Sequence, residues 1–149
     1  MDFLKKLGIS IKDNFLTKTY GFYVGLTSFI IMILIACIYC GIDPTLYNSN
    51  VMLYVILGIC LFIVFSIFKE TALLSQVSVV VFSFLSFCAF ANTDGLIDYV
   101  STQFFDGFTL TKLFALEYHF WLSIVLILLA FIVSSVALYM PQNKTKEIK

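Results

Sequence analysis

The chain has 149 residues, of which 61% are hydrophobic and 12% are charged. Soluble domains carry about 25% charged residues, so this composition offers too little polar surface to cover a globule in water. All nine cations are Lys, balanced by nine acidic residues. The lack of Arg counts against phosphate or nucleic-acid recognition, and the alternative is that it reflects an AT-rich genome.

Residues 1–18 predict a short amphipathic helix on the cytoplasmic membrane surface. The apolar side chains of Phe3, Leu4, Leu7, Ile11 and Phe15 recur at helical spacing, within about 120° of arc, and Lys side chains take the opposite side. A cleavable signal would place an apolar core of about 7–15 residues directly after its positive region. Here the uncharged run starts near residue 20 and is longer.

Four uncharged apolar segments follow, each close to the length that crosses a hydrocarbon layer of about 30 Å as a helix. We predict spans at 21–42, 51–68, 72–92 and 119–140. Tyr20, Trp121 and Tyr139 favour the headgroup regions at their ends. The sequence therefore predicts an all-α integral membrane protein, a four-transmembrane-helix bundle that forms a single membrane domain over 1–149.

The connections divide the charges between two sides. Residues 93–118 form one long amphipathic connection, predicted to lie on the outer membrane surface or over the bundle, and Asn92, Thr93 or Asp94 can cap its short helix. Residues 141–149 are a basic tail. Only Lys112 falls on the side of that connection. Because Lys-rich segments stay cytoplasmic, we predict a multi-pass plasma-membrane protein with both termini cytoplasmic, and the composition favours a bacterial source.

Small side chains follow one face of the first span and one face of the fourth. They are Gly21, Gly25, Ser28 and Ala36 in the first span, and Ser123, Ala130, Ser134 and Ala137 in the fourth. Such stripes let helix backbones approach closely. We therefore predict that both faces contact other helices, within the chain or in a partner.

The third span is the most polar of the four. Ser75, Gln76, Ser78, Ser83 and Ser86 fall on about one half of its helical wheel. Two interpretations stay open, namely packing against a neighbouring helix and the polar lining of a small pore or ligand cleft.

The predicted spans contain no Asp, Glu, Lys or Arg. The chain resembles small multidrug antiporters in length and number of spans. That resemblance implies a Glu in the first span, which this chain lacks, and proton-coupled transport is therefore disfavoured.

Cys37 and Cys40 form a Cys-x-x-Cys pair near the outer end of the first span. The pair resembles that of bacterial disulfide-forming quinone reductases, which are also small four-span proteins, and the resemblance implies thiol oxidation by a quinone. Those enzymes, like vitamin K epoxide reductase-like proteins, need a second Cys pair in the long outer loop, and 93–118 contains no Cys. The alternative is that both thiols are small packing residues.

His119 is the single His and lies two residues after Glu117. A metal site needs three or four ligands, so the choice lies between an interfacial His and an acid–base role with Glu117 or Asp43. We predict no metal and no cofactor.

The sequence thus favours a small non-enzymatic polytopic membrane protein. We predict an accessory or assembly subunit of a larger membrane complex, or a homo-oligomer. Its partners would be the lipid bilayer and other membrane subunits or itself, and no nucleic acid. One alternative is a small channel or facilitator for a neutral or small solute, and a second is a membrane thiol oxidoreductase that uses Cys37 and Cys40.

Overall fold

The computed structural model describes residues 18–67, 71–105, 107 and 117–141. Its helices are α2 (Tyr20–Tyr39), α3 (Ser49–Ile67), α4 (Ala72–Ala91), α5 (Leu96–Phe104) and α7 (Tyr118–Leu138). Four of them, α2, α3, α4 and α7, are long and apolar enough to cross a membrane. The predicted all-α, four-helix membrane bundle is confirmed. The predicted amphipathic segment 1–18 lies outside the described residues except for Lys18, and so does the tail beyond 141.

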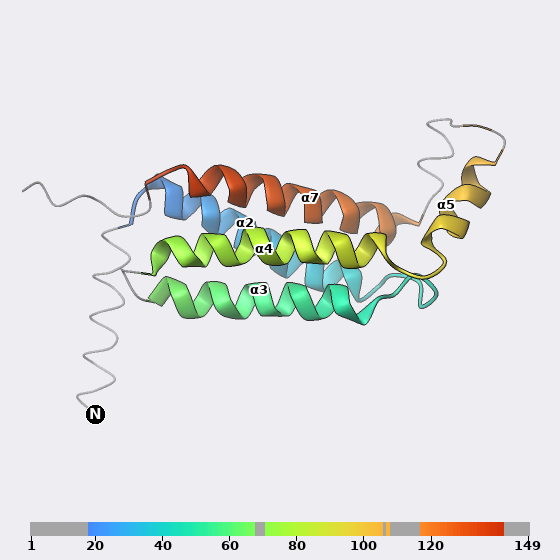
Figure 1. Cartoon of the computed structure of the whole chain (residues 1–149), viewed down its shortest axis with the longest axis horizontal. Helices are drawn as coiled ribbons and strands as arrows, with labels where there is room; N and C mark the ends of the chain where they lie inside the picture. Colours follow the sequence, from blue (N-terminus) through green and yellow to red (C-terminus); the bar gives the residue numbers. More distant parts are fainter. Residues whose placement is uncertain (1–17, 68–70, 106, 108–116, 142–149) are drawn as a thin grey trace, which may run out of the picture.

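The four long helices lie side by side, with α2 and α4 running in one direction and α3 and α7 in the other (Figure 1). Helix α4 packs along both α3 and α7, while α2 packs along α7 and touches α3 and α4 more lightly. The first and last long helices are therefore neighbours. We call the end of the bundle where α2 and α4 finish the α5 end, because α5 extends beyond it.

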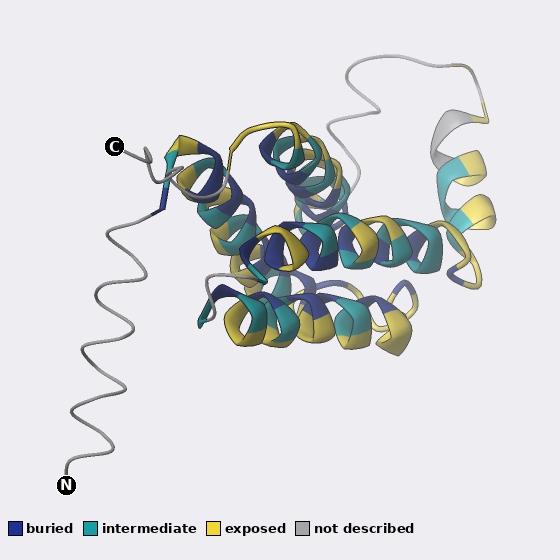
Figure 2. Ribbon diagram, turned by 60° about the vertical axis from the view of Figure 1, so that its left-hand side comes forward, coloured by how far each residue is buried: buried dark blue, intermediate teal, exposed yellow. Residues whose placement is uncertain are grey.

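Each long helix buries a narrow stripe and leaves its other apolar side chains exposed (Figure 2). Phe22, Met32, Ile35, Val55 and Ile127 belong to the buried core. Outward-facing side chains on every long helix are about half exposed, and they too are apolar. An outer surface of this kind is unfavourable in water and well solvated by lipid chains, so the bundle belongs in a bilayer.

The two ends of the described chain meet at the end of the bundle opposite α5. The Thr19 hydroxyl donates a hydrogen bond to the carbonyl of Pro141. The Lys18 ammonium group lies 4.9 Å from the ring centroid of Phe22, and Lys18 itself is buried. The bond between Thr19 and Pro141 fastens the start of α2 to the end of α7, and the Lys18 contact lies within the start of α2.

Helix α5 begins after the residues that the sequence predicted as its side-chain caps, Asn92, Thr93 or Asp94. Its N-cap is Gly95, with φ of 78° and no side-chain cap bond, a left-handed conformation that glycine adopts without steric cost. Two of the three predicted caps bond to α4 instead, since Asn92 Nδ2 donates to Cys88 O (2.9 Å) and Thr93 Oγ1 donates to Ala89 O (3.3 Å). That prediction was wrong because these side chains bond backwards along the chain.

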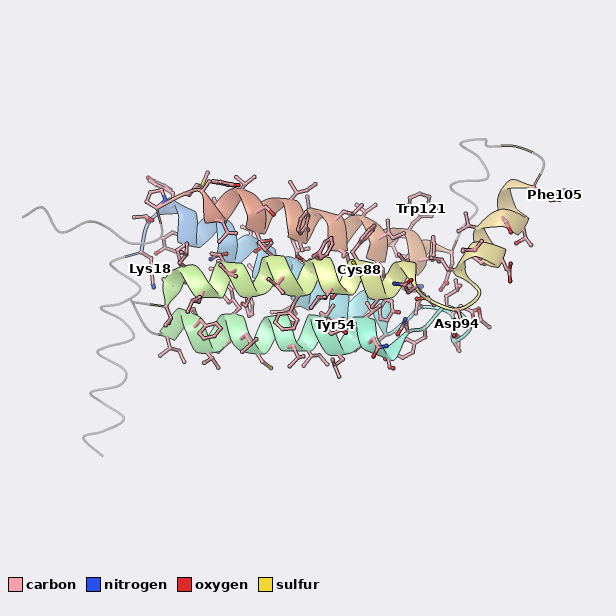
Figure 3. All side chains as sticks on the ribbon, in the orientation of Figure 1. Lys18, Tyr54, Cys88, Asp94, Phe105 and Trp121 are labelled. Carbon is pink, nitrogen blue, oxygen red and sulfur yellow. The ribbon has the colours of Figure 1, made fainter. Side chains whose placement is uncertain are left out.

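Helix α5 itself is amphipathic and projects beyond the bundle, with one face packed against the core. Leu96, Tyr99 and Val100 pack against the core, whereas Ile97 is 80% exposed and Phe105, just after the helix, is 89% exposed. Phe105 lies at the tip of this projection in Figure 3.

Candidate functional site

The small-residue stripes lie inside the chain. All of their members are buried except Ala36, which is half-buried. Helices α2 and α7, which carry the two stripes, pack along each other, and Gly25, Ser28, Ser123 and Ala130 are all shielded from solvent. The two faces are thus used within the bundle.

The polar face of α4 is also buried, and its serines are bonded within their own helix. The four hydroxyls donate to carbonyls three or four residues earlier: Ser75 to Ala72 (2.6 Å), Ser78 to Ser75 (2.7 Å), Ser83 to Val80 (3.1 Å) and Ser86 to Phe82 (2.7 Å). This back-bonding satisfies a serine without a neighbouring helix. These hydroxyl protons are therefore already engaged.

Gln76 is different from the serines around it. Its side chain is 0% exposed, and neither Nε2 nor Oε1 meets a hydrogen-bond partner among the described residues. The amide lies against Gly25 of α2, where an added Cβ would be 1.8 Å from Gln76 Oε1. The sequence placed Gln76 on the correct face, but it did not indicate the glycine opposite.

All four cysteines are free thiols. Cys37, Cys40 and Cys60 are exposed on the bundle surface, and Cys88 is half-buried. Cys40 is the C-cap residue of α2, so the Cys-x-x-Cys pair lies at the α5 end of that helix.

Glu117 joins three elements at the α5 end. Its carboxylate accepts hydrogen bonds from the backbone N–H of Asp43, at 3.2 Å to Oε1 and 3.3 Å to Oε2. His119 Nδ1 lies 3.5 Å from Glu117 Oε1, and the Glu117 N–H donates to the Tyr99 hydroxyl of α5 (3.0 Å). A Cβ on Gly41 would lie 2.9 Å from His119 Nε2, so the imidazole is held between Gly41 and Glu117.

Asp43 enters this cluster through its backbone. Its carboxylate is occupied by Thr45, accepting from the Thr45 N–H (2.8 Å) and hydroxyl (2.6 Å). These two bonds stabilise the charged form and hold the pKa of the Asp43 carboxyl below its usual value. Two partners were predicted for His119. The carboxylate of Glu117 lies beside the imidazole, whereas Asp43 is linked to His119 only indirectly, because its backbone N–H bonds to the same Glu117 carboxylate.

Asn48 is a second connecting residue, which the sequence reasoning missed. Its N–H donates to the Tyr39 hydroxyl (2.8 Å), its Nδ2 donates to Ala89 O (2.9 Å), and its Oδ1 accepts from the Asn50 N–H (3.0 Å). The last bond caps the start of α3. One side chain and its backbone thus tie α2, α3 and α4 together. The sequence offered two Asn residues just before the apolar run, Asn48 and Asn50, and Asn is a typical N-cap, but the pattern did not decide between them.

Three adjoining hollows open at this end of the bundle. One, of about 410 Å³, lies between the end of α4 and the start of α5, and a second, of about 330 Å³, lies between that turn and the loop before α3. They share Asn92, Thr93 and Asp94. A third, of about 270 Å³, reaches between α3 and α4 to Tyr54 and Cys88, which Figure 3 places on neighbouring helices. We call these three cavities the polar hollows.

The walls of the polar hollows are rich in neutral hydrogen-bonding groups and carboxylates. Asn50 and Asn92 contribute side-chain amides, Thr45 and Thr93 contribute hydroxyls, and further along Asp98 adds a carboxylate to that of Asp94. Among the described residues, no group of three or more His, Cys, Asp or Glu could hold a metal ion. The chemistry offered there is hydrogen bonding and attraction of positive charge.

No protein-family model, curated protein or solved structure matches this chain. What the fold defines is a small polytopic membrane protein built from four apolar helices.

Proposed function

We propose that this protein is a non-enzymatic accessory or assembly subunit of a larger membrane complex and holds its partner through the polar hollows. The observation that carries the proposal is a concave polar surface on an otherwise lipid-facing bundle. The bonds of Asn48 and Glu117 fix the loops that form it. A surface already fixed before binding loses little conformational entropy when a partner docks.

The chemistry of the surface specifies the kind of partner. Side-chain amides of Asn50 and Asn92 can both donate to and accept from a peptide backbone. Asp94 and Asp98 are exposed carboxylates on the same surface. The occupant that fits is a loop of another membrane protein that carries Lys or Arg.

The proposal takes the orientation predicted from the Lys distribution, with both termini cytoplasmic. The α5 end then faces the outside of the plasma membrane, and the partner loop is extracytoplasmic. The exposed apolar side chains of the long helices keep the rest of the bundle in the lipid.

The accessory role is favoured over the two alternatives by specific contacts. The serine hydroxyls of α4, the proposed lining of a channel, donate to their own helix. The resemblance behind the oxidoreductase hypothesis implies a second Cys pair in the long outer connection, and residues 93–118 contain no Cys.

The proposal is tested by purifying the chain from its native membranes in a mild detergent and measuring the mass of the particle. We expect a particle heavier than the 16.9 kDa chain, containing one other membrane protein. That protein should be lost from D94K/D98K and kept by S101K, which places a Lys at an exposed position of α5 outside the lining of the polar hollows. An inert monomer contradicts the proposal, and a particle containing only copies of this chain replaces it with self-association.

A further inference from the structure

Gln76 carries a buried carboxamide that the proposed docking role does not use. Gln76 is fully buried in α4, next to Ser75 and two residues before Ser78, whose hydroxyls bond to their own helix. Among the described residues, both its Nε2 and its Oε1 lack a hydrogen-bond partner. Leaving a donor and an acceptor unpaired in an apolar interior is costly, and in a membrane core water does not solvate them from outside.

The amide points at the backbone of α2. Its Oε1, Cδ and Nε2 lie 1.8 to 2.0 Å from the position that a Cβ on Gly25 would take. Glycine at this position therefore creates the notch that the amide enters. Gly21 and Ser28 lie about one turn to either side on the same buried stripe, so the side chains around the notch are small.

Ser28 supplies a further oxygen beside the notch. Its hydroxyl donates to the carbonyl of Gly25 at 2.6 Å, which leaves the lone pairs of Ser28 Oγ able to accept. Gln76 offers one acceptor at Oε1 and two donor hydrogens at Nε2. A group that donates and accepts can bond to both residues, and two to four bonds are what buried waters typically make.

The ligand must be neutral. The segments that form α2, α3, α4 and α7 contain no Asp, Glu, Lys or Arg, so an ion bound beside Gln76 would have no counter-charge on the spanning helices. An unpaired charge in the bilayer core is far more costly than a neutral dipole.

We propose that Gln76, with Gly25 and Ser28, forms a binding site for a neutral hydroxyl group inside the bundle. The group donates to Gln76 Oε1 or to Ser28 Oγ and accepts from Gln76 Nε2, and a water molecule, with two hydrogens, can donate to both oxygens. It belongs to a water molecule or to a small uncharged solute such as a polyol. The site lies between α2 and α4, toward the end of the bundle that carries Thr19 and Pro141.

The test uses the full chain in liposomes, with the glutamine side chains labelled with ¹⁵N. The chain has three glutamines, Gln76, Gln103 and Gln142, so three side-chain amide signals are expected in solid-state NMR. The signal that disappears in Gln76→Met is that of Gln76. We expect magnetisation to pass from water to this signal, although its side chain is fully buried.

Ser28→Ala gives a second variant that keeps Gln76 and the small side chain on α2. It removes one acceptor beside the site, so we expect transfer from water to the Gln76 signal to fall while the signal itself persists. A matched control is Ser86→Ala, a buried serine of α4 far along the helix from Gln76, which should leave the transfer unchanged.

Glycerol distinguishes the two sources of the hydroxyl group. A saturable shift of the Gln76 signal on adding glycerol assigns the site to a solute hydroxyl, and transfer from water without such a shift assigns it to water. Both results support the site. A Gln76 signal with neither water transfer nor a glycerol shift overturns the proposal, as does a Ser28→Ala variant indistinguishable from the native chain.

Discussion

Asn48 provides the most direct test of how the α5 end is held together. Its Oδ1 caps the Asn50 N–H at the start of α3, and its Nδ2 donates to Ala89 O at the end of α4. Replacing an N-cap Asn by Ala costs about 1 kcal/mol. Loss of a side-chain hydrogen bond costs about another 1 kcal/mol.

The cost of losing the bond from Asn48 Nδ2 to Ala89 O stays at about 1 kcal/mol because the carbonyl of Ala89 keeps another hydrogen-bond donor. The Thr93 hydroxyl also donates to it, at 3.3 Å. We therefore expect Asn48→Ala to lower the free energy of unfolding by about 2 kcal/mol. Asn48→Ser keeps a capping oxygen but is too short to reach α4, so it should cost about half as much, roughly 1 kcal/mol.

The assay is SDS-induced unfolding in mixed micelles, followed by circular dichroism. Ser49→Ala is the control, because Ser49 is the exposed neighbour in the same turn and should change stability by less than about 0.5 kcal/mol. The reasoning is refuted if Asn48→Ala is as stable as the native chain, or if Asn48→Ser loses as much as Asn48→Ala.

Three further predictions concern individual contacts. Gly25→Ala should lower the free energy of unfolding by about 1–3 kcal/mol through overpacking, because its Cβ would overlap the Gln76 amide. Adding Gln76→Ala to the same chain should restore much of that stability, and a double-mutant cycle in which the two effects simply add would contradict the contact. Glu117→Ala should cost about 1 kcal/mol by removing the acceptor of the Asp43 N–H, with Glu117→Gln milder, and equal unfolding curves for all three proteins would disprove this role. Thr45→Val removes the hydroxyl that lowers the pKa of Asp43, so an NMR titration should show a higher pKa for Asp43 in the variant, and an unchanged pKa counts against this role. Because the folded pKa of Asp43 lies below the unfolded one, the stabilisation by this hydrogen bond is present above about pH 4 and is lost as pH falls through the folded pKa.

The four spans could be predicted because an uncharged apolar run carries its own transfer free energy to lipid. The ends of the helices could not be predicted as well. The first span was predicted to reach residue 42, whereas α2 ends at Tyr39. Residues 40–42 are as apolar as the helix before them, but their backbone forms turns, with the Gly41 N–H bonded to Ile38 O and the Ile42 N–H to Tyr39 O, and hydropathy does not distinguish a turn from a helix.

The candidate site was harder to predict than the fold. Its contacts join residues far apart in sequence, such as Asn48 to Ala89, 41 positions away, and Asp43 to Glu117, 74 positions away. The spacing of apolar and polar residues within one helix does not predict such pairs. Burial of Gln76 followed from the helical wheel, but the facing Gly25 depends on how α2 and α4 pack.

The central claim is that another membrane protein is held at the polar hollows. It is tested most directly by a photo-crosslinking amino acid placed at Asp94, in the hollows, and in a separate chain at Phe84, an exposed lipid-facing residue of α4. After illumination of intact cells, the account predicts one protein adduct from position 94, to an extracytoplasmic loop rich in Lys or Arg, and none from position 84. A chain that stays uncrosslinked at position 94, or gives the same adducts from both positions, would contradict it.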